Sequence, residues 1–186
     1  TAFQTPSLLC AMNELSNHDH SRFLTRTNRK IGRIDTRGAA VADEGLNFGT
    51  FRSAAIVQMT WPGAPPVYYG DEAGLCGWTD PDNRRTYPWG KENQELVTFY
   101  RIMGEIRRNN KVFCDGYFSP VSGMLGCVAF RRHNENGDIM IIVNRNEHSI
   151  TYRLPEFYCN AKTLYGEAVQ NGEVYIDGCD FVILSL

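Results

Sequence analysis

The stretch Leu8–Arg22, LLCAMNELSNHDHSR, joins an apolar run to a strongly polar one. Its first five residues, Leu8–Met12, are apolar and predict a buried β-strand. The segment Ser16–Arg22, SNHDHSR, then places two imidazoles, a carboxylate and a guanidinium within seven residues. Because the active site of a parallel α/β fold lies beyond the carboxyl ends of its strands, this segment is the first candidate for a functional site.

The composition is that of an ordinary globular protein. The 186 residues fit one large domain or two small ones, and 42% of them are hydrophobic. The net charge of -2 gives no support for a polyanionic partner. Six cationic residues fall between positions 22 and 37, but no aromatic platform or groove-entering module accompanies them. We therefore expect a solvated, arginine-rich loop and no nucleic-acid or membrane partner, since no apolar run approaches the roughly 20 residues of a membrane span.

The six cysteines, at positions 10, 76, 114, 127, 159 and 179, form no CxxC pair and have no histidine at metal-ligand spacing. A chain of this length does not need disulfides to build a stable core. We expect reduced and mostly buried thiols, which favours a cytoplasmic location.

Residues 1–111 alternate between strand and helix signals. Leu46–Trp61 has apolar residues on one helical face and is stopped by Pro62-Gly63. Val67–Tyr69 is a short β-prone run, and a second amphipathic helix follows. The apolar positions of the two predicted helices are Phe48, Phe51, Ala55 and Met59 in the first, and Leu96, Phe99, Tyr100, Met103 and Ile106 in the second. The order strand, helix, strand, helix indicates a parallel α/β unit.

Residues 112–186 read as short strands separated by turn residues. Two β-rich runs are joined by Asn134–Gly137, NENG, a strong hairpin signal. The predicted strands are Met124–Arg131, Asp138–Asn144, Ser149–Leu154, Ala161–Tyr165, Glu173–Ile176 and Phe181–Leu186. This spacing is typical of an antiparallel β-sandwich.

The α/β unit is too small to stand alone. Parallel strands are normally buried on both faces, yet the chain supplies only one parallel neighbour for Leu8–Met12. With Thr1 rather than Met at the start, we expect the C-terminal piece of a longer protein, with exposed strand edges and apolar helix faces that favour a homodimer.

The second predicted strand also ends in polar residues. Gly70-Asp71-Glu72 follows it, and Gly77–Arg85, GWTDPDNRR, comes shortly afterwards. The residues that follow two successive predicted strands thus place carboxylates and arginines at one edge of the predicted sheet, which we call the rim. Carboxylates beside aromatic rings suit a sugar site, where negative charge stabilises a developing oxocarbenium ion. The aromatic residues near this rim are Tyr68, Tyr69, Trp78 and Trp89.

These motifs resemble the end of an α-amylase family glycoside hydrolase. The resemblance rests on Asn17-His18-Asp19 with Arg22, on PGAPPVYYGDE at residues 62–72, and on DPDNRR with Pro88-Trp89. Within that family the chain is most similar to the neopullulanase, cyclomaltodextrinase and maltogenic amylase branch. The resemblance covers nearly the whole chain. It implies strands 7 and 8 of a (β/α)8 TIM barrel with their helices over residues 1–111, and a C-terminal antiparallel β-sandwich domain over residues 112–186.

Carried over by position, the resemblance implies a role for four residues. Asp19 is the catalytic carboxylate that stabilises the transition state, and His18 binds the same sugar. Asp80 and Arg84, from DPxxR, are implied to bind the adjacent glucose. The alternatives are a helix-capping or turn role for Asp19, a structural role for His18, and a pair across one turn for Asp80 and Arg84.

Other residues are expected to play structural parts. Asp71 and Glu72 are expected to buttress the strand end against Arg22 or Arg85. Packing is favoured over sugar stacking for Trp78 and Trp89, and His20 is read as a loop residue.

A retaining glycosidase needs a nucleophile and an acid/base carboxylate about 5 Å apart. The family places both upstream of the segment that this chain resembles. The superficial match Gly32–Asp35 lacks the family's register, so Asp35 is read as a loop residue. The resemblance therefore implies a segment of a retaining α-glucoside hydrolase acting on maltooligosaccharides, starch or cyclodextrins through α-1,4 bonds, with α-1,6 bonds as a second option. We expect the segment alone to be inactive. No organic cofactor is implied and no metal is assigned.

Two alternatives remain open. The chain can be a non-catalytic relative that keeps the amylase fold for carbohydrate binding or assembly. Otherwise the function can lie in the β-sandwich, as a sugar-binding module.

Overall fold

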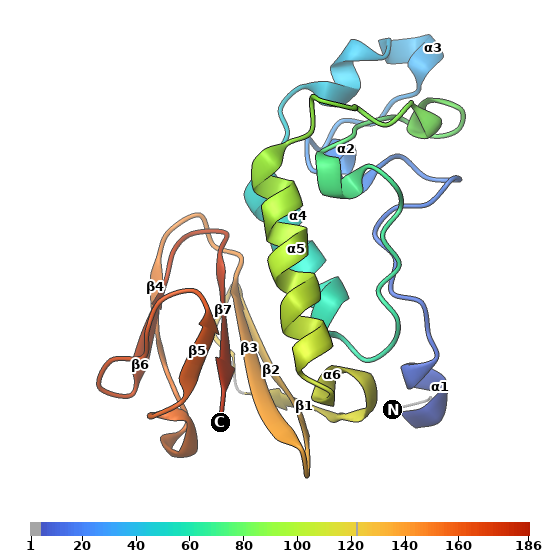
Figure 1. Cartoon of the computed structure of the whole chain (residues 1–186). Coiled ribbons are helices and arrows are strands. Elements are labelled where there is room, and N and C mark those ends of the chain that lie inside the picture. The colour runs from blue at the N-terminus through green and yellow to red at the C-terminus, as the bar shows by residue number, and fades with distance from the viewer. Residues whose placement is uncertain (1–4, 122) are drawn as a thin grey trace.

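A computed structural model of the chain describes residues 5–121 and 123–186, and it places helices before strands along the sequence (Figure 1). The α-helices are α1 Thr5–Leu9, α2 Phe23–Arg26, α3 Ile34–Arg37, α4 Phe48–Thr60, α5 Gln94–Asn109 and α6 Val112–Asp115. The 3-10 turns are η1 Ala40–Asp43, η2 Asp71–Ala73, η3 Asp82–Arg84 and η4 Glu156–Tyr158. Among the residues described, no helix is both long and apolar enough to cross a bilayer.

The two long helices begin at asparagine caps. The side chain of Asn47 accepts a hydrogen bond from the Thr50 amide at 2.7 Å, and that of Asn93 accepts one from the Leu96 amide at 3.0 Å. Both predicted helices are confirmed. In α4, Phe51 and Ala55 are fully buried, whereas Phe48, in the first turn, is 38% exposed.

The strands form two sheets. They are β1 Tyr117–Val121, β2 Cys127–Asn134, β3 Gly137–Asn144, β4 Ile150–Arg153, β5 Lys162–Tyr165, β6 Glu173–Ile176 and β7 Phe181–Ser185. One sheet has the order β1-β2-β3-β7-β5, and β4 pairs with β6 in the other. All these pairs are antiparallel, so the predicted sandwich is confirmed, with Asn134 paired to Gly137 at the hairpin. β1 was not predicted, because Ser119 and Pro120 interrupt its pattern.

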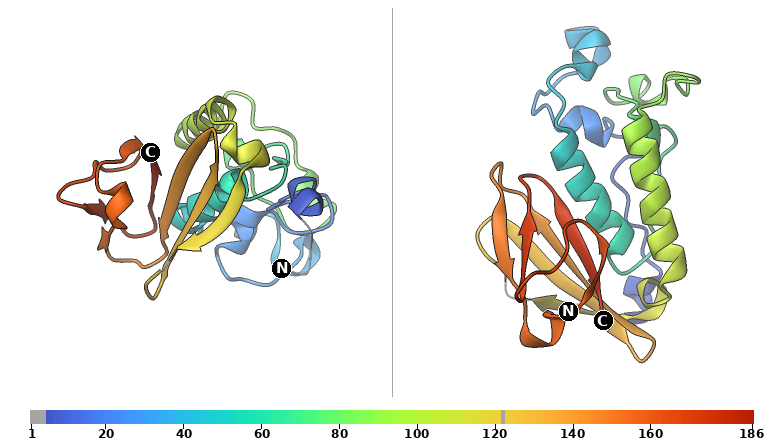
Figure 2. Two further views of the ribbon diagram at one scale, coloured as in Figure 1. Left: turned by 90° about the horizontal axis from the view of Figure 1, so that it is seen from below. Right: turned by 60° about the vertical axis from the view of Figure 1, so that its left-hand side comes forward.

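The larger sheet is buried on both faces. One face packs against α4, α5 and α6, and the other packs against β4 and β6 (Figure 2). In β3, Ile139, Ile141 and Val143 contact the helix side, while Met140 and Ile142 lie in the core between the sheets. This alternation follows from the two-residue period of a strand, and the double burial explains why β3 is continuously apolar.

Two arginines tie the end of α4 to the rest of the molecule. Arg107 from α5 donates to the carbonyl oxygens of Met59 and Gly63, both at 2.7 Å. Arg132 from β2 is fully buried and donates to the Thr60 carbonyl at 2.9 Å. The bonds to Met59 and Thr60 satisfy carbonyl groups that a helix end leaves unpaired. The apolar core is also continuous across residue 111, so the domain boundary at 111/112 stays a prediction.

The predicted strands of the α/β part are not formed. Leu8 and Leu9 lie in or at the end of α1, and Met12 is 68% exposed rather than buried. One isolated parallel bridge, between Met12 and Ala64, marks where two parallel strands would meet, and Val67–Tyr69 is extended without a ladder partner. A parallel strand needs neighbours on both sides, and the described residues supply none beyond this bridge.

The thiols are less buried than predicted. Cys76 and Cys127 are buried, but Cys10 and Cys114 are exposed, and Cys159 and Cys179 are half-buried. None of the six forms a disulfide within the part of the chain described.

Candidate active site

The segment Asn17–Asp19 forms a turn that its own asparagine shapes. Asn17 Oδ1 accepts hydrogen bonds from the backbone amides of Asp19 at 2.9 Å and His20 at 3.1 Å. Asn17 Nδ2 donates to Glu14 Oε1 at 2.8 Å. The turn leaves the side chains of His18 and Asp19 60% and 70% exposed, with His18 Nε2 3.4 Å from Asp19 Oδ1. The two residues are therefore presented to solvent and are not packed into the core.

Arg22 connects this turn to residues 69–71 by hydrogen bonds. Its side chain is fully buried and donates from Nη1 to the Tyr69 carbonyl at 2.7 Å and to Asp71 Oδ1 at 3.0 Å. Its guanidinium carbon also lies 4.4 and 4.8 Å from the ring centres of Tyr68 and Tyr69. This is the geometry of cation–π contacts. The expected buttress by Asp71 is thus formed with Arg22, and Arg85 takes a different partner.

Asp71 is an unusual carboxylate because it is only 3% exposed. Burial raises its pKa to about 6, although hydrogen bonds from Ser16 and Arg22 and the charge of Arg22 act in the opposite direction. Desolvation disfavours the charged carboxylate more than its partners favour it. Asp71 therefore belongs to the buried frame of the rim and takes up a proton in mildly acidic solution.

Asn83 joins the two polar loops. It is fully buried, and its Nδ2 donates to the carbonyl oxygens of Asn17 at 3.2 Å and His20 at 2.8 Å. The backbone carbonyl of Asn83 accepts a hydrogen bond from Arg22 Nε at 2.9 Å. The turn at Asn17–Asp19 is therefore fixed directly to the DPDNRR loop, and the two predicted parts of the site share one rim.

Asp80 and Arg84 form an exposed ion pair across η3, with 2.5 Å between Asp80 Oδ1 and Arg84 Nε. This is the pairing across one turn that the sequence left open. The hydrogen bond to Asp80 raises the pKa of Arg84, and the negative charges of Asp80 and Asp19 act in the same direction. The charge of Asp19 thus acts on the Asp80–Arg84 pair. The four predicted site residues lie together, while their roles stay predictions.

Some neighbouring residues are packed into the protein, and others are exposed to solvent. Arg85 pairs with Asp82 and with Asp43, both at 2.9 Å. Trp78 is 1% exposed and packs as predicted, whereas Trp89 is 82% exposed, so the packing prediction for it is wrong. Its ring lies 4.5 Å from that of Tyr87.

Several features of the rim have no clear sequence signal. Asn83 is one polar residue in a polar loop, and nothing in DPDNRR distinguishes it as the buried one. Asp35 lies in the short helix α3 rather than a loop, and it is exposed. Within the described residues, no group of three or more His, Cys, Asp or Glu side chains is placed to hold a metal ion.

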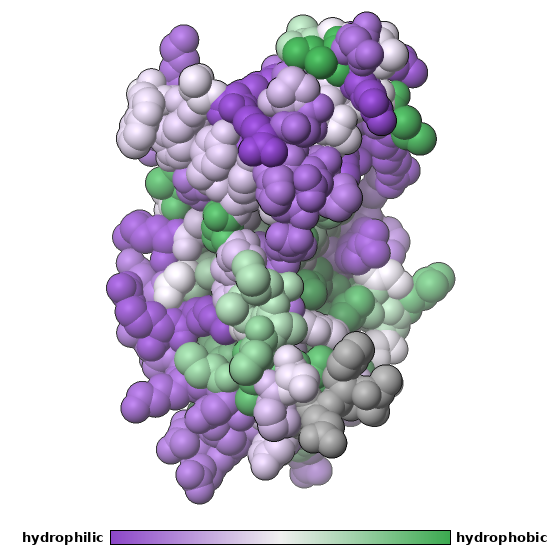
Figure 3. All heavy atoms as spheres, turned by 90° about the vertical axis from the view of Figure 1, so that its right-hand side faces the viewer, coloured by the Kyte–Doolittle hydropathy of each residue, from purple (hydrophilic) through white to green (hydrophobic). Residues whose placement is uncertain are grey.

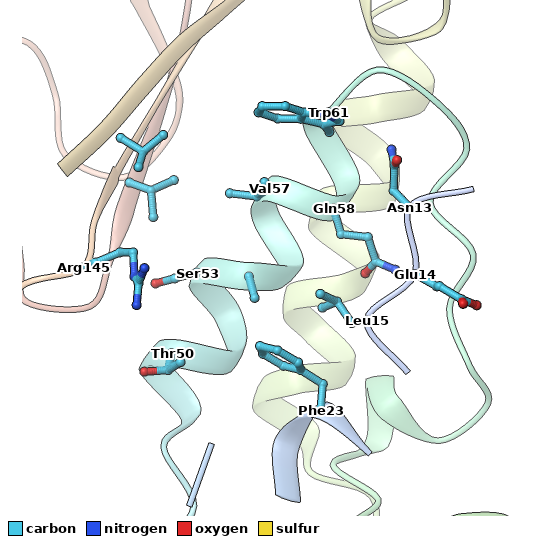
Figure 4. Close-up of a pocket in the computed structure, with 13 residues that line it drawn as sticks. Asn13, Glu14, Leu15, Phe23, Thr50, Ser53, Val57, Gln58, Trp61 and Arg145 are labelled. Atoms are coloured by element: carbon cyan, nitrogen blue, oxygen red, sulfur yellow. The ribbon is translucent and has the colours of Figure 1, made fainter. Parts of the chain in front are cut away.

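An apolar cavity of about 530 Å³ lies between α4, residues 13–15 and the strands β2 and β3 (Figure 4). Phe23, Val57 and Trp61 line it, and Gln58 at its edge is bonded to the Pro66 carbonyl at 2.7 Å. The cavity holds no group of acidic side chains, so its chemistry is packing rather than catalysis. It marks an apolar flank of α4 that the described residues leave uncovered.

Comparisons with known proteins show which enzymes this fold is similar to. A solved debranching enzyme from Nostoc punctiforme superposes on 99% of this chain and 37% of its own, with a TM-score of 0.79 and 25% identity. An amylopullulanase of Thermoanaerobacter thermohydrosulfuricus is 38% identical over 135 residues, and a cyclomaltodextrinase of Thermoanaerobacter pseudethanolicus is 31% identical over 136 residues. No protein-family model matches the chain.

The chain is therefore homologous to one segment of the α-amylase family enzymes, and the resemblance that the NHD and DPDNRR motifs indicate is confirmed. The aligned residues make up 73% and 72% of this chain, but only 9% of the amylopullulanase and 21% of the cyclomaltodextrinase. The predicted fold class, part of a (β/α)8 barrel followed by an antiparallel sandwich, is confirmed with it.

Proposed function

We propose that this chain is the part of a retaining α-glucoside hydrolase that supplies the transition-state-stabilising aspartate, Asp19. One observation carries the proposal. His18, Asp19, Asp80 and Arg84 are exposed polar residues on one rim, held there by a buried polar frame centred on Asn83. Burying polar groups costs free energy unless they are hydrogen-bonded. We therefore infer that this buried frame serves to hold the four exposed residues in position.

The proposed mechanism follows from the charges. Cleavage of a glucoside passes through a transition state that resembles an oxocarbenium ion, with positive charge on the sugar ring. The carboxylate of Asp19 stabilises this charge and accepts hydrogen bonds from ring hydroxyls. His18 holds the same sugar, and the Asp80–Arg84 pair offers an acceptor and a donor to the next glucose. The substrates are maltooligosaccharides, starch or cyclodextrins, with α-1,4 bonds and, as a second option, α-1,6 bonds.

The nucleophile and the acid/base are not among the residues of this rim. Asp71 is buried against Arg22, and Asp35 is exposed on α3. A retaining enzyme needs a nucleophile and an acid/base about 5 Å apart across the scissile bond, and neither Asp71 nor Asp35 is placed to serve as one of these two carboxylates. The segment alone is therefore expected to be inactive.

The test is kinetic. In a protein that supplies the upstream barrel strands and so completes the barrel of this segment, Asp19→Asn lowers kcat on maltooligosaccharides by about 10²–10³-fold, because charge stabilisation is lost in the transition state. Asp35→Asn is the matched control and leaves kcat unchanged. Reducing-sugar assays of both variants, and of the 186-residue chain alone, check the proposal. An active Asp19→Asn enzyme, or turnover by the chain alone, would contradict it.

A second candidate is carbohydrate binding without catalysis, which the exposure of Trp89 favours. Its ring is open to solvent and supported by Tyr87, as a sugar-stacking platform requires. If this is the whole function, Trp89→Ala weakens maltooligosaccharide binding in calorimetry, and Asp19→Asn has no effect on it.

We also propose that the chain associates through its uncovered barrel surface. The apolar cavity beside α4 lies on that surface. Light scattering of dilute chain is expected to show a dimer, and a monomer would count against this.

A further inference from the structure

A second cavity, lined by cationic side chains, lies beside the rim, at the end of the molecule that carries α3. Figure 3 shows that hydrophilic side chains dominate the upper half of one face of the molecule. The cavity holds about 690 Å³ and is bounded by the loop from Lys30 to Arg37 and by Trp78 and Thr79. Four cationic side chains line it, namely Arg26, Lys30, Arg33 and Arg37, and no described Asp or Glu lines it.

Most of this charge is not neutralised within the protein. Lys30 pairs with Glu44 at 3.0 Å. Arg26, Arg33 and Arg37 have no carboxylate within ion-pair distance among residues 5–121 and 123–186. Three guanidinium groups around one cavity produce a positive potential that favours the binding of an anion. A guanidinium group can donate two parallel hydrogen bonds to two oxygens of one phosphate.

The loop that carries these arginines is anchored and is not a loose surface segment. Trp78 Nε1 donates to the Gly38 carbonyl at 3.0 Å, and Arg85 Nη2 donates to the Ala39 carbonyl at 2.7 Å. The stem of Arg37 lies across Gly32, in the space that a Cβ on that glycine would occupy. The absence of a side chain at position 32 therefore leaves room for Arg37 in this position.

The cavity adjoins the proposed sugar site. Ser21 and Thr79 line it, two residues from Asp19 and one residue from Asp80 respectively. We propose that this cavity binds the phosphate group of a phosphorylated sugar, held by Arg33 and Arg37. The phosphate is carried by a phosphorylated α-glucan lying on the rim or by a free sugar phosphate. The glucan source rests on the proposed function, and the anion site itself does not.

The test compares ligands by calorimetry on the 186-residue chain at low ionic strength. The probes are maltotetraose, maltotetraose with one 6-phosphate, glucose 6-phosphate and inorganic phosphate. The phosphate is expected to increase the affinity for maltotetraose by about tenfold or more, because hydrogen bonds between charged groups are strong. The increase declines as salt is added, because these arginines are exposed.

Three variants test which residues cause the increase in affinity. Arg33→Gln combined with Arg37→Gln abolishes the increase, and Gly32→Ala reduces it with no change of charge, because the new Cβ displaces Arg37. The control, Arg108→Gln with Arg153→Gln, removes the same charge from exposed positions outside the cavity and leaves the increase intact. Circular dichroism confirms that each variant is folded.

The outcomes separate the sources and the two proposals. If glucose 6-phosphate binds as tightly as the phosphorylated maltotetraose, the site stands and its ligand is a free sugar phosphate. If glucose 6-phosphate binds but maltotetraose does not, the phosphate site stands and the proposed glucan function fails. Equal binding of inorganic phosphate overturns the assignment to a sugar. Absence of any increase, or its survival in the double Arg33 and Arg37 variant, overturns the proposal.

Discussion

The sandwich is held mainly by apolar contacts and ladder hydrogen bonds, whereas the rim is held by buried polar side chains. In the sandwich, both faces of β3 are covered, and residues such as Ile141 and Ile142 are fully buried. In the rim, the fully buried residues include Arg22 and Asn83. Apolar contacts tolerate small changes of shape, but a buried charge depends on each of its partners. The rim is therefore the more precisely positioned region and the more easily broken one.

Each region contains an arginine–aspartate pair, and the two aspartates titrate differently. Burial raises the pKa of Asp71 in the rim to about 6. In the sandwich, burial also acts to raise the pKa of Asp138, but hydrogen bonds from Arg131 and Tyr158 outweigh it and the pKa is lowered. Asp138 keeps 18% of its side chain exposed, against 3% for Asp71. Partial access to water lets a hydrogen-bonded carboxylate remain ionised.

The largest expected effect is on the rim. Arg22→Met leaves Asp71 buried without its charged partner and removes the bond to the Asn83 backbone carbonyl, so the free energy of unfolding falls by about 3–5 kcal/mol. Urea unfolding measures this, and hydrogen exchange is expected to show loss of protection in the rim while the strands keep theirs. Arg101→Met, which breaks an exposed pair on α5, is the control, with a change within about 0.5 kcal/mol. A similar small effect for Arg22→Met would show that the rim does not depend on this arginine.

The next effect is on the core that both regions share. Ile141→Ala removes a fully buried side chain between the sheet and the helices and costs about 2–4 kcal/mol through lost burial and a cavity. Here hydrogen exchange is expected to increase in the strands and in α4 together. Val128→Ala, at a half-exposed position on β2, is the matched control with a smaller cost. If only the strands respond to Ile141→Ala, the helices and the sandwich fold independently.

The smallest effect separates the two aspartates by pH. Because the folded pKa of Asp71 lies above its ordinary value of 3.8, the folded chain holds a proton that the unfolded chain releases between pH 4 and 6. This stabilisation is largest below about pH 4 and falls by about 2 kcal/mol between pH 4 and pH 6. Asp138 acts in the opposite sense, since its lowered pKa stabilises the fold above 3.8 and this is lost at lower pH.

Two variants show which aspartate causes each change of the unfolding free energy with pH. Urea unfolding of Asp71→Asn is expected to lack the fall between pH 4 and 6, and Asp138→Asn is expected to retain it. Identical pH profiles for the wild type and Asp71→Asn would mean that Asp71 keeps its charge in the fold.

The accuracy of the predictions from the sequence also differs between the sandwich and the α/β part. The hairpin at Asn134–Gly137 and β6 were predicted closely, because antiparallel pairing is local and its two-residue period is visible in the sequence. β1 was missed because Pro120 interrupts its pattern. The strand at Leu8–Met12 failed for another reason, since a short apolar run fits a helix as well as a strand.

The sequence by itself determined which residue types reach the rim, because NHD and DPDNRR are short motifs whose chemistry is carried by their own side chains. It also determined the sandwich, through alternation along each strand. Only the tertiary structure decided that Asn83 joins the two motifs, that Arg22 is buried against Asp71, and that Trp89 stands in solvent. Burial and hydrogen bonding between residues 47 to 66 positions apart depend on the path of the whole chain, and no local pattern encodes them.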